Sequence, residues 1–139
     1  MSDRPMPKTD GLNRPFWEGC DASRLMLQRC GNEQCRRYVY YPRVCCPHCH
    51  QDRLAWVQAC GRGRIEVWSA IHRPQFEGFK HEAPIPFVAV RLEEGPLMYS
   101  RLASRPDDGC DLSGRTVHVV FSDPVAGRRL PYFELDEAG

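Results

Sequence analysis

The sequence lacks long hydrophobic stretches and has almost no lysine. No apolar run approaches the roughly 18–20 residues with which a helix crosses a bilayer, so we expect no membrane-spanning helix. Residues 1–13 also lack a hydrophobic signal segment, and we therefore expect the protein in the cytoplasm. Lys8 and Lys80 are the only lysines. A GC-rich genome produces this bias without any function, although arginine is also the better ligand for phosphates and carboxylates.

A strong excess of charge of either sign is absent too. The 19 Lys and Arg residues nearly balance the 18 Asp and Glu residues, which leaves a formal net charge of +1. One zinc ion with four thiolates would add about two negative charges. Because charge-driven binding to nucleic acid needs a positive surface, this composition argues against nucleic acid as the main ligand.

Cysteine, in contrast, is abundant, and five of the eight cysteines fall within the twenty residues 30–49. Four disulfides in a secreted protein would be the alternative, but without an export signal this clustering favours metal binding. Cys46 and Cys49 have the two-residue spacing of a metal knuckle, and Cys30 and Cys35 have a spacing of four, at the wide end of the ~2–4 range for zinc pairs. Four thiolates leave no open position for water on the ion, so the spacing predicts a structural zinc site.

Three neighbouring residues compete for the same site. Cys45 could replace Cys46, but it would then be separated from Cys49 by three residues, so we favour Cys46. His48 or His50 could replace a thiolate, and we expect both to be exposed turn residues instead.

No catalytic residue is predicted. Glu93 and Glu94 are adjacent and therefore unsuited to act as a general-acid pair, and we expect them at a solvated hairpin tip. The other cysteines have no histidine or acidic partner at an informative spacing and are expected to pack as small apolar residues. These cysteines are Cys20, Cys60 and Cys110, and the scattered histidines are His72, His81 and His118, the last expected on the outer face of a barrel.

The secondary-structure signals are those of one short helix and many short strands. Residues 15–21 predict a helix with Asn13 as its cap, and this helix is too short to be stable without docking. Strands 24–29 and 37–41 flank the first cysteine pair and predict a zinc ribbon. Five strand signals follow it, at 65–71, 87–92, 97–102, 116–121 and 132–135.

This pattern predicts a mainly β protein with a short N-terminal helix, a rubredoxin-like zinc ribbon and a five-stranded OB-fold barrel. A β-sandwich is the alternative, but it usually needs about seven strands in about 100 residues. We predict a flexible arm at 1–13, the helix and ribbon at 14–55, and the barrel at 56–139.

Several short motifs occur in a characteristic order. They are Phe16-Trp17, the first cysteine pair, Tyr41-Pro-Arg43, Cys46-Pro-His-Cys49, Gly61-Arg-Gly63, the hairpin at 88–95 and the tail Leu130-Pro-Tyr-Phe133. Over roughly residues 14–135 this order resembles the acyl-CoA-associated zinc-ribbon/OB-fold family, formerly a domain of unknown function. The family's first pair usually has two intervening residues, which would place a cysteine at Asn32, whereas this chain has Cys30.

The resemblance implies a non-catalytic accessory subunit that binds an acyl-CoA enzyme. Family members typically associate with thiolase-like enzymes or with hot-dog-fold enoyl-CoA hydratases, whose own residues perform the chemistry. We expect a thiolase-type partner, with a hydratase as the alternative. Arg62 and Arg64 could then contact a coenzyme A phosphate or a partner carboxylate, or they could be solvated arginines at a glycine-bent barrel corner.

A third possibility is that the barrel binds single-stranded nucleic acid. OB barrels often stack bases on aromatic side chains, and Trp68, Tyr99 and Tyr132 could provide such a platform. Aromatic residues beside arginines suit a protein interface equally well.

Overall fold

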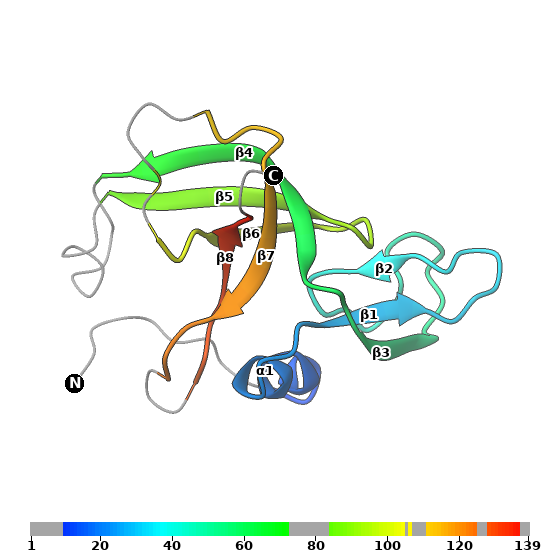
Figure 1. Ribbon diagram of the computed structural model, residues 1–139. Coiled ribbons are helices and arrows are strands. Elements are labelled where there is room, and N and C mark those ends of the chain that lie inside the picture. Colours follow the sequence, from blue (N-terminus) through cyan, green and yellow to red (C-terminus); the bar gives the residue numbers. More distant parts are fainter. Residues whose placement is uncertain (1–9, 73–83, 105, 107–110, 125–127, 137–139) are drawn as a thin grey trace.

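The computed structural model describes residues 10–72, 84–104, 106, 111–124 and 128–136. Within these ranges the chain forms one helix and eight strands, which are arranged in two antiparallel sheets (Figure 1). The predicted flexible arm at residues 1–13 falls mostly outside the described residues. Residues 10–13 form a turn, in which the Asp10 carboxylate accepts hydrogen bonds from the N–H groups of Leu12 at 2.9 Å and Asn13 at 2.8 Å.

The helix α1 (Arg14–Asp21) begins one residue before the predicted start, with a proline in its first turn. Asn13 occupies the N-cap position, as predicted, but its side chain makes no capping hydrogen bond. Its Oδ1 accepts a hydrogen bond from the N–H of Asp10 at 2.8 Å instead. The helix buries Phe16 and Trp17, which gives it the docking surface that so short a helix needs.

The zinc ribbon contains a three-stranded sheet with the order β2-β1-β3. Its strands are β1 (Met26–Cys30), β2 (Tyr38–Val39) and β3 (Leu54–Gln58). The strand β3 was not predicted, and it pairs with β1 along its whole length, from Met26↔Gln58 to Cys30↔Leu54. The division expected between residues 55 and 56 therefore falls inside a strand of the ribbon sheet.

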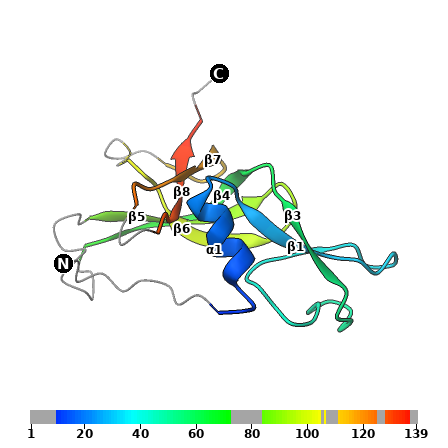
Figure 2. The ribbon, with the colours of Figure 1, turned by 90° about the horizontal axis from the view of Figure 1, so that it is seen from below.

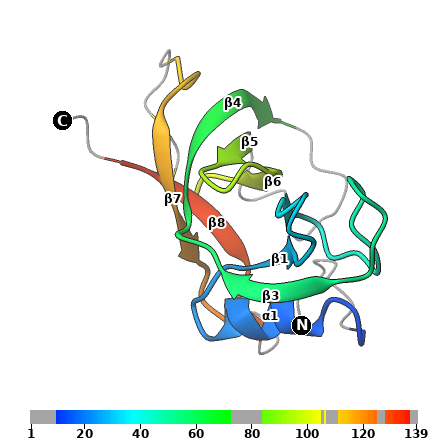
Figure 3. The same ribbon diagram turned by 90° about the vertical axis from the view of Figure 1, so that its right-hand side faces the viewer.

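The second sheet is the predicted five-stranded barrel, with the order β6-β5-β4-β7-β8. Its strands are β4 (Arg62–Ile71), β5 (Ile85–Leu92), β6 (Leu97–Arg101), β7 (Thr116–Phe121) and β8 (Pro131–Leu135). A parallel bridge between Leu102 and Phe133 closes it, and the N–H of Ala103 donates to the Phe133 carbonyl at 2.8 Å. Figure 3 shows β4 curving above β5 and β6, on the side opposite α1.

The helix, the first ribbon strand and the barrel share one hydrophobic core. Phe16 of the helix and Leu27 of β1 belong to the same buried cluster as Val88, Met98 and Phe133 of the barrel. The view from below shows α1 lying across the underside of the barrel (Figure 2). Because no polar layer separates them, these elements pack as one body. No helix in the described ranges is long and apolar enough to span a membrane.

Candidate functional site

The structure brings together the four cysteines whose spacing predicted a zinc site. The sulfur atoms of Cys30, Cys35, Cys46 and Cys49 all lie within 4.8 Å of one another. The Sγ atoms of Cys30 and Cys49 are 3.5 Å apart, and those of Cys35 and Cys46 are 3.8 Å apart. Zn–S bonds of about 2.3 Å in a tetrahedron place sulfurs about 3.8 Å apart, so the donor set and its spacing fit one zinc ion.

Backbone amides of the knuckle point at its sulfurs. The N–H of His48 donates to Cys46 Sγ at 3.4 Å. A hydrogen bond from the Gln51 backbone is the largest of the effects that lower the pKa of the Cys49 thiol to about 6. Donors aimed at sulfur stabilise the thiolate, which is the form that binds metal.

The wide first pair is accommodated by Asn32, the position where the family pattern would have a cysteine. The Asn32 carbonyl accepts hydrogen bonds from the N–H groups of Cys35 at 2.9 Å and Arg36 at 3.0 Å. Its backbone also hydrogen-bonds Cys30, and its side chain hydrogen-bonds Cys49. This turn places Cys35 in the cysteine cluster, and Asn32 itself hydrogen-bonds Cys30 and Cys49.

The competing candidates lie outside the cluster. Cys45 is exposed, and so are His48 and His50. The Nδ1 atom of His48 is 3.1 Å from Nη1 of Arg37, on the surface.

Sequence reasoning missed Gln28, a buried residue that supports the knuckle. Only 4% of Gln28 is exposed, although it lies in the middle of β1. Its Nε2 donates to the Arg43 carbonyl at 2.9 Å, and its Oε1 accepts from the Arg43 N–H at 2.7 Å. The NH₂ group and the oxygen of the Gln28 side chain are therefore both hydrogen-bonded to the main chain of Arg43, three residues before Cys46.

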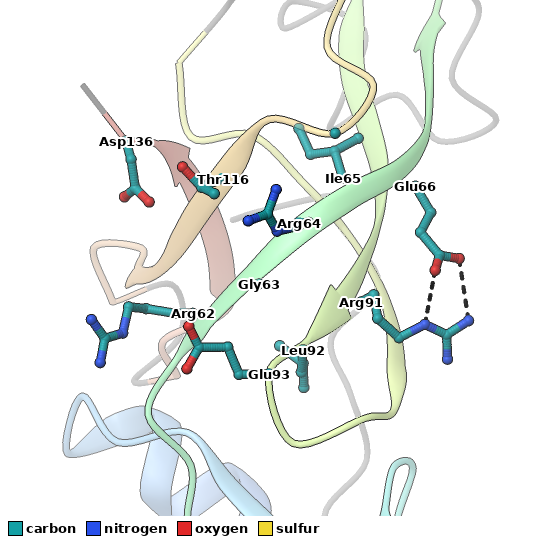
Figure 4. Close-up of a pocket in the computed structure, with 11 residues that line it drawn as sticks. Arg62, Gly63, Arg64, Ile65, Glu66, Arg91, Leu92, Glu93, Thr116 and Asp136 are labelled. Atoms are coloured by element: carbon teal, nitrogen blue, oxygen red, sulfur yellow. Dashed lines mark hydrogen bonds and ion pairs between the residues drawn. The ribbon is translucent and has the colours of Figure 1, made fainter. Parts of the chain in front are cut away.

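The two arginines singled out in the sequence line a pocket of about 590 Å³ on the barrel (Figure 4). Arg62 and Arg64 are exposed on β4, and neither forms an ion pair with any residue that the structure describes. The buried Gly63 between them lets β4 approach β5, because a Cβ there would lie 2.6 Å from the Arg91 carbonyl oxygen. Arg91, in contrast, is held by both carboxylate oxygens of Glu66, at 2.9 and 3.2 Å.

Glu93 and Glu94 lie in the turn of the β5–β6 hairpin, as predicted, and Glu93 is exposed, but both carboxylates also have hydrogen-bond partners. The N–H of Cys60 donates to Glu94 Oε2 at 2.8 Å, and its thiol donates to Glu93 Oε2 at 3.3 Å. The two carboxylates thereby bind the link between β3 and β4. Burial, followed by the two carboxylates, raises the pKa of the Cys60 thiol, which makes it a poor nucleophile.

One histidine and three aromatic side chains that the sequence analysis singled out have partners close by. Among them, His118 Nδ1 is 2.6 Å from Asp136 Oδ1, and the imidazole holds the pKa of that carboxyl below its usual value. The exposed Tyr99 ring stacks on Phe87, with centroids 6.0 Å apart. Two further side chains of interest are Trp68, which hydrogen-bonds Asp111, and Tyr132, which lies under the Arg101 guanidinium at 5.1 Å. His81 and Cys110 lie outside the described residues.

Comparison with known proteins identifies both parts of the chain. Residues 17–55 match the family described as the ChsH2 rubredoxin-like zinc ribbon domain, and residues 56–122 match the ChsH2 C-terminal OB-fold domain. A chain of the Ltp2-ChsH2(DUF35) aldolase superimposes with a TM-score of 0.79 at 26% sequence identity, over 94% of this chain and 98% of that one.

Two curated relatives extend this result. A probable enoyl-CoA hydratase alpha subunit of Thermomonospora curvata is 29% identical over 130 residues, which are 94% of this chain and 39% of the relative. A DUF35 domain-containing scaffold protein of Pyrococcus furiosus is 31% identical over 80 residues, or 57% of this chain and 55% of the relative. The chain thus spans well under two thirds of the length of these relatives. On the two domain matches and the fold, it belongs to the ChsH2-type (DUF35) family of zinc-ribbon and OB-fold proteins.

Proposed function

We propose that this protein is a non-catalytic accessory subunit that binds and supports an acyl-CoA enzyme in the cytoplasm. The observation that carries the proposal is the similarity, over nearly the whole chain, to a chain of an aldolase complex and to part of a hydratase subunit. The Cys60 thiol, whose neighbours are acidic, has a raised pKa and is therefore a poor nucleophile. The partner is then the subunit that performs the chemistry.

The partner that we favour is a thiolase-type enzyme that cleaves or forms a carbon–carbon bond. The name of the structural relative, an aldolase, is compatible with that choice. The name of the sequence relative supports a hydratase partner as the second candidate. The two reactions use different acyl-CoA substrates, so turnover assays separate them.

The four cysteines would hold a structural zinc ion in this function. Because four thiolates fill the coordination sphere, the ion supplies rigidity to the ribbon and leaves no position for a substrate. The residues of this chain that would hold it are Cys30, Cys35, Cys46 and Cys49, whose geometry fits the ion. Reduced thiols of this kind persist in the cytoplasm.

Arg62 and Arg64 are our candidates for contact with coenzyme A or with the partner. Both side chains line the pocket in Figure 4 and form no ion pair in the described part of the chain, although the charge of Arg62 helps to lower the pKa of Asp136. Arginine binds phosphate and carboxylate oxygens with two parallel hydrogen bonds, so this pair suits either group.

Co-expression with candidate thiolase-type and enoyl-CoA hydratase enzymes tests the proposal. We expect the two chains to elute together in size-exclusion chromatography, and we expect thiolysis of a 3-oxoacyl-CoA or hydration of a 2-enoyl-CoA only when the enzyme is present. Turnover by this chain alone, or separate elution of the two chains, would contradict the proposal. An R62E/R64E variant should raise the KM for the acyl-CoA or weaken the complex, while an R24E/R53E variant, with two exposed arginines changed elsewhere, should do neither.

A further inference from the structure

A second pocket, of about 750 Å³, lies between the ribbon and the barrel. Ribbon residues 36–40, Pro47 and His48 line one wall, and residues of the β5–β6 hairpin, among them Leu97 and Tyr99, line the other. Figure 1 shows the turn of this hairpin beside β2. We call this pocket the ribbon–barrel cleft.

Both walls of the ribbon–barrel cleft are formed by edge strands. In the ribbon, β2 is the outermost strand, and the Arg37 carbonyl accepts from the Cys30 N–H at 2.9 Å. Main-chain groups alternate in direction along a strand, so those of Tyr38 point away from β1. Tyr38 therefore presents a free edge on the ribbon side.

The same reasoning applies to β6 on the barrel side. The N–H of Leu102 donates to the Pro86 carbonyl at 2.9 Å, so even-numbered residues of β6 face β5. The main-chain groups of Leu97 and Tyr99 then point away from β5, and no backbone hydrogen bond to them occurs within the ranges that the structure describes. Unpaired N–H and C=O groups at a strand edge are a template for another strand.

The charge of the ribbon wall indicates which side chains this main chain would carry. Arg36 and Arg37 are both exposed at the cleft, with His48 beside them, and they form no ion pair in the part of the chain described here. Arg91, at the hairpin, is already neutralised by Glu66. The uncompensated charge on the ribbon wall is therefore positive, which suits acidic side chains.

We propose that the ribbon–barrel cleft binds an extended, acidic polypeptide segment as an added β-strand on β6. The segment pairs its main chain with Leu97 and Tyr99 and places alternate acidic side chains against Arg36 and Arg37. A small anion such as phosphate would use the arginines but would leave the strand edge unpaired. The inference goes beyond the proposed function, since it requires no acyl-CoA enzyme.

Defined peptides and the full-length zinc-bound protein test this inference. The probe is a nonapeptide of alternating Glu and Val with an N-terminal fluorescein and a C-terminal amide, whose binding is followed by fluorescence anisotropy. We expect saturable binding that weakens about tenfold or more when alternate amides of the peptide are N-methylated, because about 1 kcal/mol is lost with each main-chain bond. A Lys/Val peptide of the same length should not bind.

Variants of the protein locate the binding. We expect R36E/R37E to weaken the Glu/Val peptide at least about tenfold, and the matched R24E/R53E variant to leave the affinity unchanged. Tyr99→Pro removes an outward N–H from an edge strand, where proline is tolerated, and should weaken binding more than Tyr99→Ala does. Zinc content and circular dichroism confirm that each variant is folded.

Several results would overturn the inference. These are no binding of the Glu/Val peptide at millimolar concentration, equal binding of the N-methylated or Lys/Val peptide, or equal affinity of R36E/R37E and the wild type. Displacement of the peptide by millimolar inorganic phosphate, together with insensitivity to N-methylation, would show a simple anion site instead. None of these results depends on whether an acyl-CoA enzyme binds, so the inference and the proposed function can fail separately.

Discussion

Cys30, Cys35, Cys46 and Cys49 lie in the part of the molecule with the smaller apolar core. Besides the cysteines themselves, only Val39 and the half-buried Leu54 pack in this second cluster. Two apolar side chains cannot offset the conformational entropy of ordering the loops around them. Structural zinc in small domains contributes roughly 10–16 kcal/mol, so we expect the ion to hold the ribbon.

Removing two ligands should therefore unfold the ribbon. In C46S/C49S we expect the loss of bound zinc and a large fall in Tm, because the metal-binding free energy is comparable to a whole domain's stability of about 5–15 kcal/mol. Elemental analysis and thermal unfolding measure both effects. The control is C45S, which changes the exposed neighbour and should keep zinc and Tm. An unchanged Tm in C46S/C49S would show that the site is dispensable.

The Gln28 amide should contribute measurably to stability. Gln28→Leu leaves the N–H and C=O of Arg43 without partners beside the knuckle, and we expect a loss of roughly 1–3 kcal/mol in the free energy of unfolding. Urea unfolding measures it. Gln58→Leu, at an exposed position of β3, should change stability by less than about 0.5 kcal/mol. Equal stabilities of the two variants would exclude a structural role for the Gln28 amide.

Residue-level prediction succeeded where chemistry constrains spacing. Four sulfurs have to reach one ion, so the intervals between the cysteines predict which of them bind it. The structure brings these four cysteines together. Gln28 has no such constraint, because a glutamine between Leu27 and Arg29 looks like an exposed strand position. Asn13 was correctly predicted at the N-cap, but its side chain bonds the N–H of Asp10 in the preceding turn, and this competing partner is not evident from the residue type.

At the scale of elements, Asp21 of α1 adds polar contacts with the residues just before β8 to the shared hydrophobic core. Asp21 Oδ1 accepts the Arg129 N–H at 3.1 Å, and its Oδ2 is 3.6 Å from Arg128 Nη1. The Arg128 guanidinium in turn lies 5.9 Å from the centre of the Trp17 ring. The connection between β7 and β8 is thus joined to the helix.

We expect Asp21→Ala to loosen this connection. One charge-assisted hydrogen bond is lost, and since the ion pair is partly exposed the cost should be about 1 kcal/mol. Hydrogen exchange should rise at Arg129 and Leu130, and Tm should fall by a few degrees. Glu18→Ala, at an exposed acidic position of the same helix, serves as control. Identical exchange in the two variants would contradict the assignment.

The hairpin between β5 and β6 is likewise joined to the link before β4, through Cys60. Because burial and the two carboxylates raise the pKa of this thiol, we expect its alkylation by iodoacetamide to remain slow up to pH values above the ordinary cysteine pKa. In E93Q/E94Q the alkylation should begin at lower pH, since the negative charges are gone. Peptide mapping by mass spectrometry measures the rate at Cys60, with the exposed Cys45 as internal reference. Unchanged alkylation of Cys60 in E93Q/E94Q would contradict this account.

Most strands could be predicted because their alternation and turn residues are local signals, as at β5, β6 and β7. The ribbon strand β3 could not. Its burial is irregular, and its pairing with β1 spans more than twenty residues, including the whole cysteine region. Pairing between strands so far apart in the sequence cannot be predicted from the residues of one strand alone.

At the scale of the whole molecule, the shared core makes the ribbon, helix and barrel a single scaffold. Phe16 and Leu27 are buried with barrel residues, so a disturbance of the ribbon reaches the barrel through β1. The order of motifs predicted the family and the barrel. It could not predict the ribbon–barrel cleft, because that surface arises only when the two edge strands β2 and β6 meet.

The central claim is that a zinc-held scaffold supports an active site located in another subunit. The most direct measurement is the acyl-CoA turnover of the assembled complex while zinc is removed with a chelator, with the enzyme subunit alone under the same chelator as control. We predict that turnover falls to the level of the enzyme subunit alone as this chain loses its metal and dissociates. Full turnover by a complex whose ribbon holds no zinc, or turnover by this chain without the enzyme, would contradict the account.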